Sequence, residues 1–313
     1  MVGESWMREQ GLRDALLVEV LRKRGLANVP IWSRSFPERD DAIRHWEDLT
    51  PLRDGPVAPA RAAIGDAGAV TEDLKQRARE LGADLVGVTA LRPEFIELGV
   101  NLDHDYVIAI ACYERYTKVL EGADAVELEA MQVYAKCADI ATELARHIRE
   151  ELGCPALAHH NGSVQIQAIP VMYHAGFGEL GKHGSLINPL LGANFRPGFV
   201  TTTLPLVADA PIGFGVQDYC VNCRLCETAC PGDAVAPAGD FILTDGIKRW
   251  LIDNEKCFPF SRLREEYCHL CVDVCPYIHK ENGNSELKSM FKAFVAGRKQ
   301  AGFDAPKTKE LTQ

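Results

Sequence analysis

Cysteine spacing constrains this chain more than any other feature of its sequence. Residues 220–231 follow the pattern C-x2-C-x2-C-x3-C-P, which is typical of a chain that wraps a [4Fe-4S] cluster. A second run ends in the same C-x2-C-x3-C-P pattern, and ten residues separate its first two cysteines. Zinc sites usually have two separated C-x2-C pairs, so four cysteines in one run favour iron–sulfur clusters over zinc.

The two runs are expected to share their ligands. In two-cluster ferredoxins, the last cysteine of each run binds the cluster that the other run holds. We therefore expect two [4Fe-4S] clusters. The ligands of the first would be Cys220, Cys223, Cys226 and Cys275. The ligands of the second would be Cys230, Cys257, Cys268 and Cys271.

Three cysteines remain outside the two runs. Cys112, Cys137 and Cys154 stand in apolar or helical contexts. Unpaired cysteines in such contexts behave as small hydrophobic side chains. We expect these three to be core residues and not reactive thiols.

Length, charge and hydropathy narrow the class of protein. A chain of 313 residues with 47% hydrophobic side chains is long enough for two domains. The net charge of −10 disfavours nucleic acid as a partner, because phosphate binding needs clustered Lys and Arg. No apolar run approaches the roughly 18 residues of a membrane span. The first residues carry neither a secretory leader nor a twin-arginine signal, so we expect a cytoplasmic location, where thiols stay reduced.

Apolar periodicity predicts an α/β (α+β) fold ahead of the cysteine runs. Helices are expected over residues 71–81 and 125–152, and Tyr134 would lie on the inward face of the second. Strands are expected over residues 84–89, 106–112 and 198–206.

The ends of the chain and its connectors suggest four parts. Ser5 could cap a helix that ends near Gly25, and the prolines of residues 29–65 predict an extended wrap after it. A Pro- and Gly-containing connector suggests a domain boundary near residue 210. The expected parts are the helix and wrap (1–65), the α/β domain (66–210), the cysteine domain (211–280) and a C-terminal tail (281–313).

A glycine-rich segment precedes the cysteine runs. Gly176, Gly178 and Gly181 satisfy G-x-G-x-x-G, but no clear strand leads into them and no acidic residue follows about 20 positions later. The same segment satisfies G-x-x-x-x-G-K, but His183 follows in place of the hydroxyl residue that binds magnesium. Both nucleotide-binding interpretations are therefore disfavoured. The glycines indicate a backbone that closely approaches either a flat ligand or another segment.

The chain resembles the corrinoid iron–sulfur reductases in several successive segments. These are residues 175–189, Gly192-Ala-Asn-Phe-Arg196, Thr202-Thr-Leu-Pro-Leu206 and the two cysteine runs. That superfamily contains the reductive dehalogenases and epoxyqueuosine reductase. The resemblance implies a nitroreductase-like α/β domain that holds base-off cobalamin, and a ferredoxin-like domain whose nearer cluster reduces the cobalt. It also implies that the corrinoid contacts are Gly176, Phe177, Gly178, Glu179, Leu180, Gly181, Lys182, His183 and Gly184.

Three residues favour the reductive dehalogenase branch. In those enzymes a tyrosine donates a proton, and an asparagine and an arginine support it. The resemblance gives these roles to Tyr134, Asn161 and Arg196, and a nearby guanidinium does make a phenol a better acid. It implies that a halide or similar leaving group is removed from a small organic substrate via cob(I)alamin. Ferredoxin or flavodoxin would be the external low-potential electron donor.

Other interpretations stay open at this point. The three residues could instead be a core tyrosine, a loop asparagine and an ion-paired arginine. Epoxyqueuosine reductase, a tRNA-modifying enzyme, uses an aspartate where this chain has Gly162, so that function is the alternative. A non-catalytic protein that carries electrons or a corrinoid is a further alternative.

Overall fold

The computed structural model describes residues 36–62, 65–97, 99–161, 165–244, 247–261 and 268–278. The predicted helix between Ser5 and Gly25 and the tail over 281–313 lie outside these residues. In the part of the chain that is described, no helix is both long enough and apolar enough to cross a membrane.

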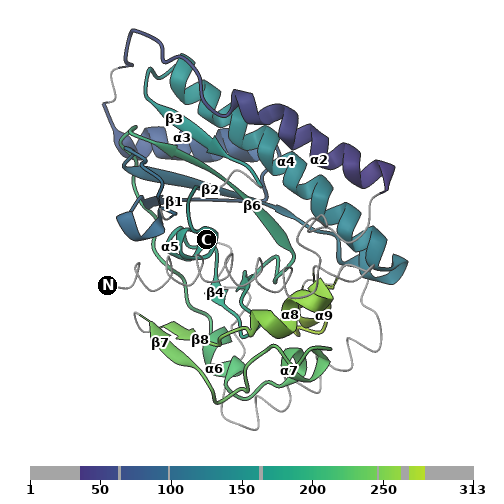
Figure 1. The fold of residues 1–313 in the computed structure, drawn as a ribbon. Coiled ribbons are helices and arrows are strands. Elements are labelled where there is room, and N and C mark those ends of the chain that lie inside the picture. The colour runs from purple at the N-terminus through teal and green to yellow at the C-terminus, as the bar shows by residue number, and fades with distance from the viewer. Residues whose placement is uncertain are drawn as a thin grey trace.

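A four-stranded antiparallel sheet forms the centre of the molecule (Figure 1). Its strands stand in the order β1-β2-β6-β3. Their bounds are Leu85–Ala90 (β1), Tyr106–Tyr113 (β2), Phe195–Thr202 (β6) and Ala156–His159 (β3). The register of β2 and β6 sets Cys112 opposite Arg196, which places Arg196 near one end of the sheet.

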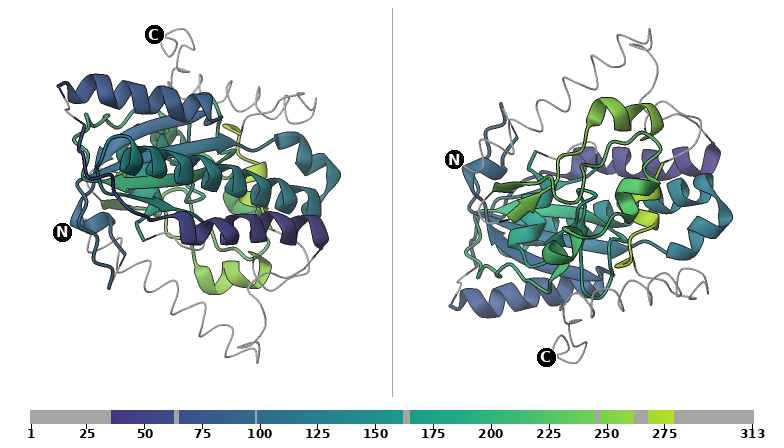
Figure 2. Two further views of the ribbon diagram at one scale, coloured as in Figure 1. Left: turned by 90° about the horizontal axis from the view of Figure 1, so that it is seen from above. Right: turned by 90° about the horizontal axis from the view of Figure 1, so that it is seen from below.

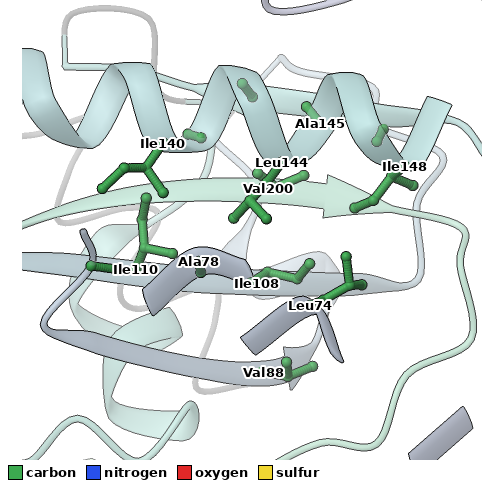
Figure 3. Packing of buried hydrophobic residues seen from close by; sticks show 14 of the residues in the cluster. Leu74, Ala78, Val88, Ile108, Ile110, Ile140, Leu144, Ala145, Ile148 and Val200 are labelled. Atoms are coloured by element: carbon green, nitrogen blue, oxygen red, sulfur yellow. The ribbon is translucent and has the colours of Figure 1, made fainter. Parts of the chain in front are cut away.

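Helices α3 (Ala67–Glu80) and α4 (Ala123–Glu150) cover one face of this sheet. Leu74 of α3 and Leu144 of α4 pack with Ile108 and Val200 of the strands into one buried cluster (Figure 3). Each of these four side chains is at most 1% exposed, so this face of the sheet is closed. The cluster holds Cys112, Cys137 and Cys154, and all three are buried as predicted.

The opposite face of the sheet carries shorter elements. They are η2 (Pro93–Phe95), α5 (Ala168–His174), β4 (Glu179–Leu180) and β5 (Leu186–Ile187). Val171 of α5 packs with Phe199 of β6 and with Ile247 from the cysteine region in a second buried cluster. The cysteine region is therefore joined to the sheet by shared apolar packing.

The cysteine region lies beyond this second face (Figures 1 and 2). Its elements are α6 (Val216–Cys220), α7 (Leu225–Ala229), the hairpin β7 (Ile242–Thr244) and β8 (Ile247–Arg249), α8 (Asn254–Ser261) and α9 (Leu270–Asp273). Trp250 is buried with Cys220 and Cys275 in a third cluster, which also contains Ile187 of β5. The division of the chain at residue 210 stays a prediction.

The periodic elements follow the sequence-based expectations closely. Helix α3 begins at Ala67, earlier than expected, because the Asp66 carboxylate caps it by accepting a hydrogen bond from Gly68 N–H at 2.8 Å. Gly82 follows it with φ of +104°, a backbone conformation that suits glycine after a helix. Strand β6 ends at Thr202 and not at residue 206, because the Thr202 hydroxyl accepts a hydrogen bond from Leu204 N–H at 3.0 Å, which turns the chain.

The expected extended wrap over residues 29–65 is wrong for residues 37–49, which form helix α2 (Pro37–Leu49). Pro37 stands in the first turn of this helix, where a missing N–H costs nothing. Ala42 and Trp46, four residues apart, bury one face of α2 against α4, and the two helices run side by side (Figure 2). The prolines on either side of this segment therefore mark the two ends of a helix and do not exclude it. Two short 3-10 helices, η1 (Thr50–Leu52) and η3 (Tyr116–Glu121), complete the described elements.

Candidate functional site

Tyr134 and Arg196 meet at the end of the sheet where α4 crosses β6. The Arg196 guanidinium carbon lies over the Tyr134 ring, 5.4 Å from its centroid. Trp46 of α2 meets the Tyr134 ring edge-on, with 6.2 Å between the centroids. Tyr134 is half-buried, so its ring is held between an aromatic neighbour and a cation. A cation over an aromatic face is attracted by about 0.5–2 kcal/mol, depending on its solvation.

Arg196 is itself held by groups that the sequence patterns did not suggest. Its Nε donates to the Glu114 carboxylate at 2.6 Å, and Glu114 is buried. One terminal nitrogen lies 3.5 Å from His269 Nε2, and His269 Nδ1 lies 2.8 Å from Asp273 Oδ1. Glu114 directly follows β2 and His269 lies inside the second cysteine run. No local spacing rule links either to Arg196, which explains why sequence analysis missed them.

Asn161 is the third residue of the predicted catalytic group. It lies two residues after the end of β3 and is half-buried. Within the described residues, no hydrogen bond or ring contact connects Asn161 with Tyr134 or Arg196. The structure therefore joins two of the three predicted residues, and the role of Asn161 stays a prediction.

Two buried histidines anchor the chain directly before Asn161. His159 Nε2 lies 2.9 Å from the Thr201 hydroxyl, and His160 Nε2 lies 2.8 Å from the Thr142 hydroxyl. Burial, together with the positive charge of Arg53, lowers the pKa of His159 to about 3 and that of His160 to about 4. Both rings are thus neutral structural groups at neutral pH.

The glycine segment packs closely against other parts of the chain. A Cβ added to Gly178 would lie 1.9 Å from the Ile187 carbonyl oxygen, and one added to Gly176 would lie 2.9 Å from the Ala210 carbonyl oxygen. Both glycines have positive φ, +154° and +78°. These two positions therefore need glycine for backbone packing. Helix α5, and not a strand, precedes the segment, which further disfavours a dinucleotide-binding turn.

Glu179 connects the glycine segment to the first cysteine run. Its buried carboxylate accepts hydrogen bonds from the N–H groups of Phe214, Gly215, Val216 and Gln217, where α6 begins. Those N–H groups have no partner inside the helix, so the carboxylate supplies their hydrogen-bond acceptor. Its negative charge also interacts favourably with the positive end of the helix dipole. Helix α6 ends at Cys220, and Glu179 therefore fixes the element that presents the first cysteine.

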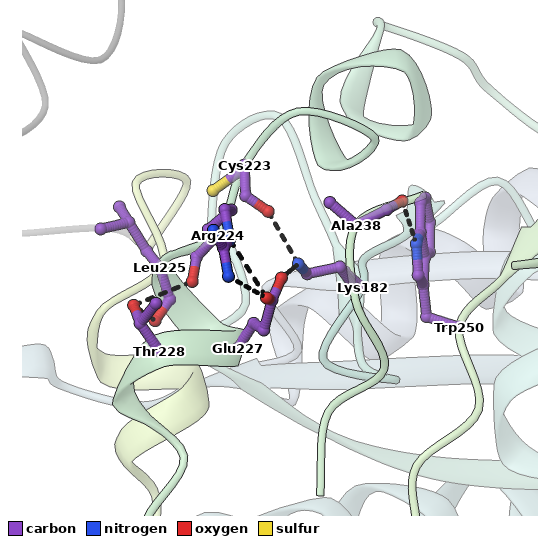
Figure 4. Close-up of polar contacts among 8 residues, drawn as sticks. All are labelled: Lys182, Cys223, Arg224, Leu225, Glu227, Thr228, Ala238 and Trp250. Carbon is purple, nitrogen blue, oxygen red and sulfur yellow. Dashed lines mark hydrogen bonds and ion pairs between the residues drawn. The ribbon is translucent and has the colours of Figure 1, made fainter. Parts of the chain in front are cut away.

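Lys182 and His183 are also buried in this segment. Lys182 Nζ donates to the Cys223 carbonyl oxygen and to Glu227 Oε2, each at 2.8 Å (Figure 4). His183 Nδ1 accepts from Ser185 N–H at 3.2 Å, so the proton of the neutral ring lies on Nε2. Burial lowers the pKa of His183 to about 4. Among the described residues, His183 Nε2 has no hydrogen-bond partner, and it could donate to a bound group that carries an acceptor such as an amide oxygen.

The cysteines of the two runs lie close enough to influence one another's pKa values, while their division into two ligand sets stays a prediction. Burial raises the pKa of Cys275 well above its usual value, and the nearby Cys220, Cys226 and Cys223 raise it further. Burial raises the pKa of Cys271 to about 12, and its cysteine neighbours contribute to this rise. Those neighbours are Cys226, Cys257, Cys268 and Cys230.

This donor set fits iron–sulfur clusters. Buried thiolates close together are unfavourable without a compensating cation, and iron supplies that charge. In the first set Cys220, Cys226 and Cys275 are buried and Cys223 is partly exposed, whereas all four cysteines of the second set, Cys230, Cys257, Cys268 and Cys271, are partly exposed. The second set of ligands therefore lies nearer to solvent than the first.

Comparisons with known proteins agree with this geometry. Residues 219–278 match the model of a 4Fe-4S dicluster domain. The tetrachloroethene reductive dehalogenase of Sulfurospirillum multivorans is 28% identical in an alignment of length 257 that covers 66% of this chain and 50% of that protein. The epoxyqueuosine reductase of Leadbetterella byssophila is 25% identical in an alignment of length 260 that covers 66% of this chain and 79% of that protein.

A solved structure extends the similarity to the fold. The catabolic reductive dehalogenase NpRdhA, in complex with 3-bromo-4-hydroxybenzoic acid, has a TM-score of 0.73 and 26% identity. The match covers 84% of this chain and 41% of that protein. The chain spans about half the length or less of the reductive dehalogenases that it matches.

Proposed function

Because this chain is homologous to reductive dehalogenases and to epoxyqueuosine reductases, which fits the corrinoid iron–sulfur reductase superfamily, we propose that it is a corrinoid- and iron–sulfur-dependent reductase of the reductive dehalogenase type. Its reaction would remove a halide or a similar leaving group from a small organic substrate. The hydrogen that replaces the leaving group would come from a protein acid.

The observation that carries this proposal is the contact between Tyr134 and Arg196. The guanidinium carbon lies 5.4 Å from the ring centroid, so a positive charge is held against the ring of the residue that would donate the proton. Glu114 binds Arg196 at 2.6 Å and fixes the direction of the guanidinium while offsetting part of its charge. Asn161 would help to orient Tyr134, as the family resemblance implies.

The cofactors would occupy the sites that the residues suggest. Cys220, Cys223, Cys226 and Cys275 would hold one [4Fe-4S] cluster, and Cys230, Cys257, Cys268 and Cys271 the other. The backbone of residues 176–184 and the His183 Nε2 proton would contact the corrinoid. When bound, a corrinoid supplies a cobalt centre that can deliver electrons to a carbon–halogen bond.

The partial exposure of the second set of cysteines suggests where electrons enter. An external low-potential protein, such as ferredoxin or flavodoxin, would reduce the cluster of Cys230, Cys257, Cys268 and Cys271 first, because that cluster lies nearer to solvent. The more buried cluster would then pass electrons inward.

Substitution of Tyr134 tests the proposal. The chain is loaded anaerobically with iron, sulfide and hydroxocobalamin, and halide release from tetrachloroethene or 3-bromo-4-hydroxybenzoate is followed with a chemical reductant. Tyr134→Phe should lower turnover by at least about 100-fold, because it removes the proton donor, while iron and cobalt contents stay unchanged. Tyr106→Phe, on strand β2, is the matched control and should keep wild-type turnover. A Tyr134→Phe protein that releases halide at the wild-type rate would contradict the assignment.

A second candidate is an epoxyqueuosine reductase-like, tRNA-modifying enzyme. It is favoured by coverage, since the aligned region spans 79% of that relative but 50% of the dehalogenase. This function predicts tight tRNA binding that weakens steeply with salt. Absence of such binding, together with halide release, would favour the dehalogenase function. A non-catalytic carrier would instead be unaffected by Tyr134→Phe in every assay.

A further inference from the structure

The buried cation next to the first cysteine run is Lys182. Its side chain is 1% exposed and reaches from the glycine segment into the loop between Cys223 and Cys226. Nζ binds the Cys223 carbonyl oxygen and Glu227 Oε2, both at 2.8 Å (Figure 4). A lysine is rarely buried so completely unless it is paired and hydrogen-bonded, and here both conditions hold.

Lys182 acts electrostatically on several cysteines of this run. Burial raises the pKa values of Cys220, Cys223 and Cys226, and the positive charge of Lys182 lowers each of them in part. The backbone of Lys182 also lowers the pKa of the Cys220 thiol. The negative charge of Glu227 has the opposite effect on Cys223. Lys182 thus places a buried positive charge beside this group of sulfur atoms.

We propose that Lys182 sets the reduction potential of the cluster held by Cys220, Cys223, Cys226 and Cys275, and that Glu227 moderates its effect. Reduction adds one electron from the donor and breaks no bond, so the cluster becomes more negative by one charge. A nearby buried cation stabilises the reduced form, and a nearby carboxylate destabilises it. The inference rests on the proposed binding of an iron–sulfur cluster by this run.

Burial distinguishes Lys182 from the other cation at this carboxylate. Arg224 also pairs with Glu227, at 2.8 Å, but its side chain is 70% exposed. Water and salt screen an exposed charge far more than a buried one. Removal of Arg224 should therefore change the potential little, although it removes the same formal charge.

The test is a redox titration of the full chain, loaded anaerobically with iron and sulfide and reduced stepwise with dithionite while EPR records the reduced clusters. At a fixed potential, Lys182→Gln should lower the ratio of reduced to oxidised first cluster at least about tenfold. This corresponds to a midpoint potential that is lower by at least about 59 mV. Glu227→Gln should shift the midpoint upward. Arg224→Gln should change the ratio by less than about twofold. The second cluster in each sample serves as an internal reference.

The outcomes separate this inference from the proposed function. A wild-type chain with no [4Fe-4S] signal would contradict the proposed function and, with it, the inference. A wild-type signal whose midpoint moves in neither Lys182→Gln nor Glu227→Gln overturns the inference alone. If Lys182→Gln does not assemble the cluster, the direction of the Glu227→Gln shift decides the question. Lys182→Arg, which keeps the charge, should restore a midpoint close to that of the wild type.

Discussion

Replacement of Glu179 by glutamine should loosen the attachment of helix α6 to the glycine segment. Oε1 of Glu179 accepts hydrogen bonds from Phe214, Gly215 and Val216, and Oε2 accepts one from Gln217 at 3.1 Å. The amide oxygen of glutamine can keep the first three as neutral bonds, each weaker by about 0.5–1 kcal/mol. The amide NH2 would face the Gln217 N–H and leave it without an acceptor, at a cost of about 1–2 kcal/mol.

Together these losses amount to about 2.5–5 kcal/mol, or at least about a 70-fold larger equilibrium constant for local opening of α6. Amide hydrogen exchange at Tyr219 and Cys220 measures that constant directly. Glu129→Gln is the matched control, because Glu129 is equally buried but its carboxylate accepts hydrogen bonds from Arg115 and not from the N–H groups of α6. Exchange of the α6 amides that is as slow in Glu179→Gln as in Glu129→Gln would refute the reasoning.

Two further predictions follow from buried groups. Gly178→Ala should lower the free energy of unfolding by at least about 2 kcal/mol, because its Cβ would overlap the Ile187 carbonyl oxygen at 1.9 Å. Gly239→Ala, where nothing lies within 4 Å, should change that free energy by less than about 0.5 kcal/mol in the same chemical denaturation; equal effects would contradict the packing argument. The pKa of His159 is about 3 in the folded chain and near 6.5 when unfolded, so the unfolded state binds a proton first and stability falls as pH drops below 6.5. Between pH 7 and pH 5, the free energy of unfolding of His159→Gln should therefore fall by about 2 kcal/mol less than that of the wild type. Parallel profiles of unfolding free energy against pH for the two proteins would contradict this prediction.

Apolar periodicity in the sequence predicted the longer helices and strands. Helices α3 and α4 and strands β1 and β2 carry clear apolar periodicity, and their positions match within a few residues. Helix α2 is not predicted, because the prolines of residues 29–65 suggest extended chain, although Pro37 stands in the first turn of a helix. Strands β4 and β5 have two residues each, too few to show any period.

The candidate site was predictable where spacing along the chain carries the information. The grouping of Cys275 with the first cysteine run follows from ferredoxin-type spacing, and the structure places it beside Cys220. The approach of Tyr134 to Arg196 was expected only through the family resemblance. The partners of Glu114 and Lys182 lie 82 and 45 residues away, and only the folded chain brings such residues together.

Metal analysis of the reconstituted chain tests the central claim most directly. After anaerobic loading with iron, sulfide and hydroxocobalamin, the proposed function predicts about eight irons and about one cobalt per chain. It also predicts EPR signals from both reduced [4Fe-4S] clusters and from a protein-bound cobalt corrinoid. A chain that binds iron but retains no cobalt would contradict the corrinoid reductase proposal and leave an electron carrier in its place.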